Sequence, residues 1–304
     1  MVHRSRGGGV TAPLLITGGS GQLAQALAAV AAGRGLAARC VGRPECDFDR
    51  PETIDAVFAA TAPRLVINAA AYTAVDAAED DEAAAFRANR DGPARLAALA
   101  AGAGIPLIHL STDYVFDGNK GAPYLETDPA APTGVYGASK RAGEEAVLAS
   151  GARALILRTA WVYSARGRNF VRTMLAAGRA GRALRVVADQ RGTPTAAEDL
   201  AELLLDLVAK VDAGAAEGHW GIYHAAGSGE ASWFAFAEAI FAEAARFGVP
   251  VPPIAAITTA DWPTRARRPA DSRLDCGKLF RVFGLALPPW RESLARVVAA
   301  LCAA

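Results

Sequence analysis

Short apolar runs alternate with longer amphipathic stretches through the first half of the chain. The runs predict buried β-strands, and the stretches between them have apolar positions at helical spacing. The expected strands are Leu14–Thr17, Ala38–Gly42, Leu65–Asn68, Pro106–Ser111 and Ala154–Thr159, and the expected helices are Gly21–Ala32, Ala83–Ala103 and Tyr136–Leu148. Because helices separate the strands, the pattern predicts βαβ units, an α/β fold class and a doubly wound parallel sheet.

The pattern becomes less regular beyond Trp161, where a glycine- and arginine-rich loop is followed by short elements of both kinds. The expected elements are a helix to about Ala177, a strand at Arg185–Ala188, a helix at Ala196–Val211, a strand at Gly221–Ala225 and a closing helix at Arg291–Leu301. We expect residues 1–12 to form a flexible tail and residues 13–163 a large domain, to which segments near 185–228 return. Residues 164–184 and 229–304 are expected to form a smaller mixed α/β lobe.

Polar residues stand directly after the expected strands. They are Thr17-Gly18, Gly42-Arg43, Asn68, Ser111-Thr112-Asp113 and Arg158-Thr159. Open parallel sheets bind their ligands outside the carboxyl ends of the strands. The sequence therefore predicts a ligand site along this edge of the sheet.

The first strand runs into a glycine turn, Gly18–Gly21, and then into a helix. Glycines let the backbone approach a pyrophosphate, whose charge then meets the free N–H groups of the helix N-terminus. A tight strand–helix connection without a ligand has the same pattern, but the preceding strand favours nucleotide binding. About twenty residues further on, NAD-selective sites place an acidic residue, whereas an arginine can pair with a 2′-phosphate. Arg43 in that place predicts NADPH over NADH, with a solvated surface arginine as the alternative.

Tyr136 and Lys140 stand at the start of an expected helix, with a spacing that puts both side chains on one face about one turn apart. A phenol has a pKa near 10, and lowering it to about 7 requires roughly 4 kcal/mol. An ammonium group about 4 Å away supplies about that much at an effective dielectric constant of about 20. The pair alone also fits an exposed helix face. Together with the glycine turn and Ser111-Thr112, it predicts a nicotinamide-dependent reductase in which Tyr136 and Lys140 are catalytic.

These motifs make the chain resemble the extended short-chain dehydrogenase/reductases, and among them the reductases of nucleotide-linked 4-keto sugars, from about Leu14 to the C-terminus. The motifs that carry the resemblance are Gly18–Leu23, Asn68–Asp76, Ser111–Gly118, Tyr136–Lys140, Arg158–Tyr163 and Asp189–Thr195. The resemblance implies a Rossmann-type sheet and the NAD(P)H-dependent reduction of dTDP-4-dehydro-L-rhamnose to dTDP-L-rhamnose, a precursor of cell-surface polysaccharide.

Other reactions of the same superfamily fit the sequence less well. Its dehydratases carry a Glu directly after the Thr-Asp pair, where this chain has Tyr114, so the resemblance disfavours dehydration. Two alternatives stay open: reduction of a different nucleotide 4-keto sugar, and a non-catalytic NADP-binding regulatory subunit.

The resemblance also implies roles for single residues, with residues 13–163 binding NAD(P) and the smaller lobe binding the substrate. The implied cofactor-binding residues are Gly18, Gly21, Gln22, Leu23, Arg43, Asp47, Phe48, Ala71, Tyr72, Thr73, Tyr136 and Lys140. Asp47 and Phe48 would flank the adenine. Thr112 would be the third catalytic residue and would hold the keto oxygen, while Asp113 and Trp161 would contact the sugar nucleotide.

An arginine cluster, Arg265–Arg268 together with Arg273, stands in the C-terminal part of the chain. Guanidinium groups can hold a pyrophosphate with paired hydrogen bonds, so Arg268 is an expected substrate-binding residue. A solvated basic loop is the alternative.

Charge and composition narrow the choice of partners. The chain has 32 basic and 31 acidic residues and a net charge of +1, so no global field would recruit nucleic acid or an anionic membrane. No apolar stretch approaches the roughly 20 residues of a membrane span, and we expect a cytoplasmic protein. The four cysteines have neither the spacing of a disulfide framework nor that of a zinc site.

Some proteins of the family that this chain resembles bind magnesium at a dimer contact, through an acidic side chain just after the glycine turn. Gln25 and Ala26 stand there, so we expect no metal, although a homodimer stays compatible with the sequence. His109 is expected to be a buried core residue, and Trp233 a packing residue.

Overall fold

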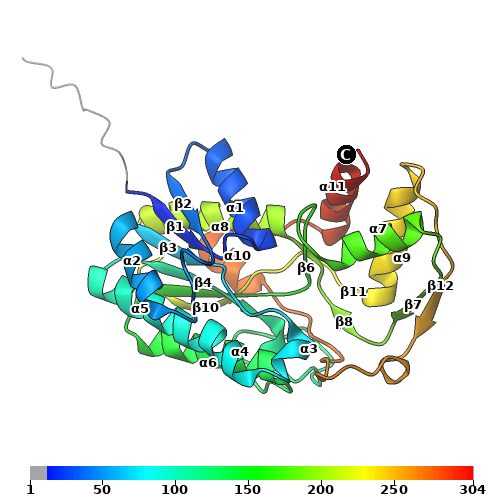
Figure 1. Cartoon of the computed structure of the whole chain (residues 1–304), viewed down its shortest axis with the longest axis horizontal. Helices are drawn as coiled ribbons and strands as arrows, with labels where there is room; N and C mark the ends of the chain where they lie inside the picture. The colour runs from blue at the N-terminus through cyan, green and yellow to red at the C-terminus, as the bar shows by residue number, and fades with distance from the viewer. Residues whose placement is uncertain (1–11, 304) are drawn as a thin grey trace, which may run out of the picture.

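A parallel six-stranded sheet lies at the centre of the larger domain (Figure 1). The computed structural model describes residues 12–303, so residues 1–11 of the expected tail lie outside the described residues. The strands are β1 (Leu14–Thr17), β2 (Ala38–Val41), β3 (Leu65–Asn68), β4 (Leu107–Thr112), β5 (Ala154–Thr159) and β10 (Gly221–His224). Their order is β2-β1-β3-β4-β5-β10, and every neighbouring pair is parallel. The chain adds β2 on one side of β1 and the later strands on the other, so the strand order reverses between β1 and β3. Open parallel sheets bind their ligands at such a point.

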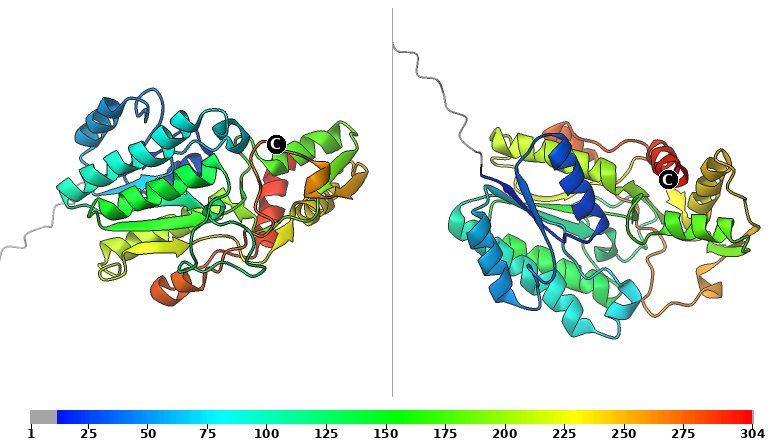
Figure 2. Two further views of the ribbon diagram at one scale, coloured as in Figure 1. Left: turned by 90° about the horizontal axis from the view of Figure 1, so that it is seen from below. Right: turned by 45° about the horizontal axis from the view of Figure 1, so that its top comes forward.

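Helices cover both faces of the sheet (Figure 1 and Figure 2). One face carries α1 (Gln22–Gly33), α8 (Ala197–Asp212) and α10 (Gly277–Phe283), and the other carries α2 (Pro51–Thr61), α5 (Gly92–Ala103) and α6 (Val135–Ala149). Leu14 and Ile16 pack with α1 and α8, whereas Leu15 packs with α2 and α5, because successive side chains of a strand point to opposite faces. Burial on both faces explains the continuous apolar runs. The predicted doubly wound sheet is confirmed.

A smaller lobe lies beside the sheet domain and is built from three helices and three short strand pairs (Figure 1). The helices are α7 (Phe170–Arg179), α9 (Trp233–Ala245) and α11 (Trp290–Cys302). The strand pairs are β6 (Val162–Tyr163) with β9 (Thr195–Ala196), β7 (Leu184–Val187) with β12 (Ile254–Ile257), and β8 (Arg191–Gly192) with β11 (Ala231–Ser232). The lobe has its own apolar core. Its combination of helices and short strand pairs agrees with the expected mixed α/β character.

The two parts exchange segments along the chain. Among the segments near 185–228 that the sequence assigned to the sheet domain, α8 and β10 pack with the sheet, whereas β7 and β8 pack in the lobe. α10 also packs on the sheet, through Leu279 and Phe283, although the domain prediction assigned residues 229–304 to the lobe. The final helix α11 returns to the lobe.

The helix expected at Ala83–Ala103 contains an irregular turn. It is continuous from α4 (Glu82–Phe86) through a π-helical turn, η1 (Arg87–Asp91), into α5. Pro93 in the first turn of α5 has no N–H group to donate four residues back, so the regular hydrogen-bond ladder is interrupted there. The remaining elements are the short helices α3 (Val75–Ala78), η2 (Asp113–Val115) and η3 (Thr259–Asp261).

Three further features bear on the sequence predictions. Within residues 12–303, no helix combines the length and the apolar character that a transmembrane span needs. All four cysteines are free thiols. His109 is buried, as expected for a core histidine, and so is His224.

Candidate active site

A cleft of about 960 Å³ follows the carboxyl edge of the sheet and is also lined by the lobe. This volume lies within the range of ligand pockets, roughly 300–1,000 Å³. Every expected catalytic and cofactor-binding residue lines this cleft, and so do two of the expected substrate-binding residues. The lining includes Gly18, Gly21, Gln22, Leu23, Arg43, Asp47, Phe48, Ala71, Tyr72, Thr73, Thr112, Asp113, Tyr136, Lys140 and Trp161.

The glycine turn closes tightly over the ends of β1 and β3. Gly18 has φ +92°, and a Cβ there would stand 2.7–2.8 Å from backbone atoms of Ala69 and Ala70, so only glycine fits. The N–H group of Gly19 donates to the carbonyl oxygen of Val41 at 2.8 Å, which ties the turn to β2. The first N–H groups of a helix lack acceptors within the helix, and α1 begins here beside the cleft. This arrangement fits a pyrophosphate.

The part of the cleft beside β2 fits an adenosine with a phosphate on its ribose. The Phe48 ring packs closely on α5, where a Cβ at Gly92 would stand 2.1 Å from it. Arg43 is exposed and lines the same cleft as this ring. A second guanidinium group, that of Arg87, lines the same cleft and pairs with Asp49 at 2.7 Å. An aromatic ring and cationic side chains therefore flank the expected adenosine position.

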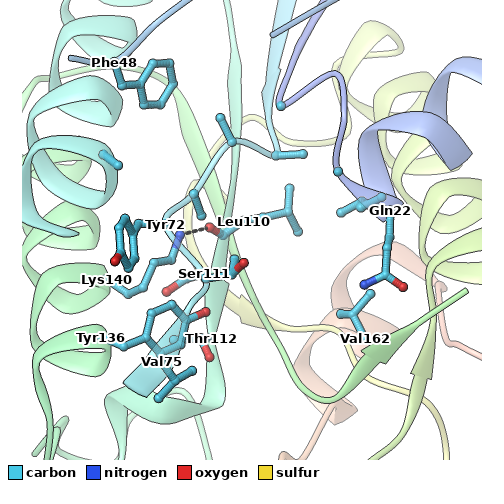
Figure 3. Close-up of a pocket in the computed structure, with 18 of the residues that line it drawn as sticks. Gln22, Phe48, Tyr72, Val75, Leu110, Ser111, Thr112, Tyr136, Lys140 and Val162 are labelled. Atoms are coloured by element: carbon cyan, nitrogen blue, oxygen red, sulfur yellow. Dashed lines mark hydrogen bonds between the residues drawn. The ribbon is translucent and has the colours of Figure 1, made fainter. Parts of the chain in front are cut away.

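Tyr136 and Lys140, from the first two turns of α6, meet Thr112 at the end of β4 (Figure 3). Lys140 is buried, and its Nζ donates a hydrogen bond to the carbonyl oxygen of Leu110 at 2.6 Å. The ring of Tyr136 makes an edge-to-face contact with Tyr114, at 5.6 Å between ring centroids. The structure thus brings the three expected catalytic residues together.

The electrostatics of Tyr136 differ from the expectation. Burial raises the pKa of Tyr136 to about 12; a hydrogen bond with Thr112 lowers this pKa, and the charge of Asp113 raises it. The predicted depression by Lys140 to about 7 is wrong for this arrangement, because the phenol is desolvated and the ammonium group is bonded to Leu110 instead. A phenol with this pKa is fully protonated at neutral pH, which is the form that donates a proton.

Asp113 lies beside this group and is almost completely buried. Burial raises the pKa of its carboxyl group to about 6, against hydrogen bonds with Ser272 and Thr112 that lower it. Thr112 Oγ1 donates to Asp113 Oδ1 at 3.0 Å and accepts from the N–H of Tyr114 at 3.2 Å. The hydroxyl of Thr112 is therefore held in place from two sides.

Two stacked indoles line the cleft on the side of the lobe. Trp161 has a left-handed backbone, φ +45°, and its ring lies parallel to that of Trp233 at 3.6 Å between centroids. A Cβ at Gly192 would stand 2.3–2.6 Å from atoms of the Trp161 indole, so β8 also presses on this ring. Trp233, expected as a packing residue, therefore does pack, but it also lines the cleft.

The arginine cluster forms ion pairs within the chain. Arg268 Nη2 donates to Asp76 Oδ2 at 2.7 Å, Arg265 pairs with Asp80, and Arg273 pairs with Asp271 at 2.6 Å. Arg268 is not among the residues that line the cleft. The pairs of Arg268 and Arg265 join the C-terminal segment to α3 and the turn that follows it, and a role of Arg268 in substrate binding stays a prediction.

Comparison with known proteins establishes the family. The model of the RmlD substrate binding domain matches residues 12–302. The chain belongs to this family. It is 46% identical over 288 residues to a dTDP-4-dehydrorhamnose reductase from Sinorhizobium fredii, an alignment that covers 95% of this chain and 97% of the relative. The resemblance drawn from the motifs is confirmed.

Solved structures of the same family superpose closely. A dTDP-4-dehydrorhamnose reductase from Clostridium acetobutylicum is 35% identical with a TM-score of 0.87, and the match covers 95% of this chain and 99% of that one. A dTDP-4-dehydrorhamnose reductase from Bacillus anthracis, solved in complex with NADP, is 32% identical with a TM-score of 0.87 and coverage of 94% and 98%.

Within this RmlD-family chain, Asn89 is a buried site residue that the motifs did not indicate. It lies on the π-helical turn η1, and its Oδ1 accepts from the N–H of Tyr72 at 2.8 Å. Its Nδ2 donates to the carbonyl oxygen of Tyr72 at 3.1 Å and to Ser139 Oγ at 3.0 Å. Asn89 thus joins the cofactor side of the cleft to the residue before Lys140. The sequence feature that could have indicated Asn89 is its position, since it is an amide side chain in the middle of an alanine-rich helix, close before Pro93.

The described residues hold no evident metal site. Within residues 12–303, no three or more His, Cys, Asp and Glu side chains gather so that they could bind a metal ion.

We expect the buried ammonium group of Lys140 to make cofactor binding dependent on pH. Burial lowers the pKa of Lys140 from 10.5 to about 8, while the charge of Glu144 raises it. The lysine is therefore charged below about pH 8 and neutral above it, and the affinity for the anionic NADPH should fall severalfold as the pH rises through 8. The measurement is the dissociation constant of NADPH, by fluorescence titration, on both sides of that pH. In Lys140→Met the affinity should be weaker and independent of pH in this range. An equally steep pH dependence in that variant would contradict the assignment.

Proposed function

We propose that this chain uses NADPH to reduce the 4-keto group of dTDP-4-dehydro-L-rhamnose, giving dTDP-L-rhamnose. The observation that carries the proposal is the meeting of Thr112, Tyr136 and Lys140 beside the glycine turn in one cleft. The names of the relatives support the substrate, and the NADP complex of a structural neighbour supports the cofactor. The near-zero net charge supports a small-molecule substrate rather than nucleic acid.

The residues of the cleft act on the carbonyl oxygen of the sugar. Bound NADPH supplies the hydride for the carbonyl carbon. The hydroxyl of Thr112, which donates to Asp113 in the free protein, would turn to donate a hydrogen bond to this oxygen, and Tyr136 donates its proton as negative charge develops there. An alkoxide is more basic than a phenolate, so this proton transfer is favourable even though the pKa of Tyr136 is raised to about 12. The ammonium group of Lys140, one helical turn away, would attract the anionic cofactor rather than acidify the phenol.

The direct test is the oxidation of NADPH by the purified protein. With dTDP-4-dehydro-L-rhamnose, oxidation should require both the sugar nucleotide and the protein, and dTDP-L-rhamnose should appear in equal amount. Other nucleotide-linked 4-keto sugars serve as controls, and a higher kcat/KM with one of them would reassign the substrate. NADPH binding without oxidation of any of these compounds would favour the non-catalytic regulatory subunit.

Arg43 is expected to set the preference for NADPH. A hydrogen bond to a charged group contributes about 1.5–3 kcal/mol, less where water screens it, so Arg43→Ala should reduce the ratio of kcat/KM for NADPH to that for NADH about tenfold. Steady-state kinetics with both cofactors measure this ratio. Arg95→Ala is the matched control, because Arg95 is a surface arginine that pairs with Asp55 and does not line the cleft. Equal ratios in wild type and Arg43→Ala would contradict the role.

A further inference from the structure

A buried ion pair lies directly behind the catalytic residues. Glu144 on α6 is fully buried, and Arg158 on β5 is 1% exposed. Arg158 Nε donates to Glu144 Oε1 at 2.8 Å, and Arg158 Nη2 donates to Glu144 Oε2 at 2.7 Å, so the pair is bidentate. Ser111 Oγ adds a hydrogen bond to Oε1 at 2.6 Å, and Arg141 Nη1 adds one to Oε2 at 3.0 Å. Donors from three different elements therefore hold this one carboxylate.

Stability alone does not explain such a pair. Desolvating two charges costs free energy that their attraction roughly offsets, and apolar residues of similar size are often as stable in the same place. The location of the pair is more informative. Glu144 follows Lys140 by one turn on α6, and Ser111 directly precedes Thr112 on β4. One carboxylate thus connects the helix of Tyr136 and Lys140 to the strand end that carries Thr112.

We propose that Glu144 is a positioning residue of the reduction: it locks α6 against β4 and β5 through Ser111 and Arg158, and it supplies the buried counter-charge of Lys140. The proposal rests on the proposed function, because it concerns the geometry and the charge of the groups that carry out that reaction.

The surroundings of Lys140 make Glu144 its dominant charged neighbour. Glu144 is the group whose charge raises the pKa of Lys140, against the lowering by burial. From β4, His109 faces the lysine, but burial and the charge of Lys140 lower the pKa of His109 well below its usual value, so this histidine is neutral. The neutral phenol of Tyr136 lies on the same helix, and from η1 the uncharged Asn89 contacts Ser139.

Two more charged groups lie nearby, at the ends of the neighbouring strands. Asp113 follows β4 and acts on the pKa of Tyr136, and Arg158 on β5 directs its guanidinium to Glu144. Loss of Glu144 would therefore remove the negative charge that raises the pKa of Lys140, and this lysine would release its proton at a lower pH.

The test separates a positioning role from a merely structural one. Glu144→Gln keeps the shape of the side chain but leaves Arg158 as a buried unpaired cation, so this variant can lose stability. The double variant Glu144→Gln/Arg158→Met removes both charges and should restore the Tm. Ser111→Ala removes one hydrogen bond from the carboxylate and no charge. Asp199→Asn is the matched control: its carboxylate also accepts hydrogen bonds from a serine and an arginine, Ser293 and Arg296, but it does not line the cleft.

In the double variant we expect kcat to fall about tenfold at neutral pH, because the catalytic groups on α6 and β4 lose their common anchor. The basic limb of its kcat/KM profile should move to lower pH by about one unit, as Lys140 loses its counter-charge. Ser111→Ala should lower kcat less and leave the profile in place, and Asp199→Asn should match wild type.

Hydrogen exchange of the protein without cofactor gives a readout that does not depend on turnover. The helix α6, residues 135–149, should exchange faster in the double variant than in Asp199→Asn. The exchange rates of the strands β1, β2 and β3, which do not contact the pair, should be the same in both variants. A double variant with the wild-type kcat, pH profile and exchange rates would overturn the proposal. If wild type itself oxidises no NADPH with any 4-keto sugar, the proposed function fails instead, so the two failures are distinguishable.

Discussion

Tyr136→Phe is expected to lower kcat by roughly 10²–10⁴-fold, the usual contribution of a positioned general acid. The phenyl ring keeps the edge-to-face contact with Tyr114, so the shape of the cleft should not change. The variant has no hydroxyl group to donate a proton to the developing alkoxide, and water would have to replace it in a buried site. The measurement is single-turnover oxidation of NADPH by the variant with the dTDP-4-keto sugar.

The affinity for NADPH separates this effect from a general disturbance of the cleft. The dissociation constant of NADPH in Tyr136→Phe should stay within about fivefold of wild type, because the loss of one hydrogen bond costs at most about 1 kcal/mol. Tyr114→Phe is the matched control on the neighbouring ring and should retain most of kcat. Turnover of Tyr136→Phe at the wild-type rate would remove Tyr136 from the mechanism.

Gly143→Ala is expected to cost about 3 kcal/mol of folding free energy and to abolish most of the activity. A Cβ at Gly143 would stand 2.0 Å from the carbonyl oxygen of Asn89, so α6 and the π-helical turn η1 would have to move apart. Because α6 carries Tyr136 and Lys140, the same movement displaces the catalytic groups. The Tm should fall by about 6–12 °C for a chain of this size, measured by calorimetry.

Gly102→Ala is the control for this substitution. Gly102 lies near the end of α5, and a Cβ there would meet nothing within 4 Å. Alanine loses less backbone entropy than glycine in a helix, so this variant should be more stable by about 0.5 kcal/mol and fully active. A Gly143→Ala protein as stable as wild type would show that α6 and η1 do not pack as described.

The sheet was largely predictable because its strands are buried on both faces. Leu14–Thr17, Leu65–Asn68 and Ala154–Thr159 have the bounds read from their apolar runs. The helix α9 was missed, because its sequence, from Trp233 to Ala245, is apolar on almost every side and shows little of the amphipathic contrast that marks a helix. The π-helical turn was missed for a different reason, since it depends on how Pro93 and the neighbouring α6 fit together.

The sequence by itself determined the kind of chemistry. The glycine turn, the spacing of Tyr136 and Lys140, and Thr112 could all be recognised from local motifs. Each of these features consists of residues that are close in the chain or that stand at successive strand ends. It also indicated the fold, since alternating buried strands and helices admit few arrangements.

Only the tertiary structure decided how these groups are tuned. The raised pKa of Tyr136, the stacking of Trp161 on Trp233, and the anchoring of α6 by Asn89 and Glu144 all join residues far apart in the chain. The pairing of Arg268 with Asp76 is of the same kind. Burial and hydrogen bonding depend on which side chains meet in space, and no local pattern of residues contains that information.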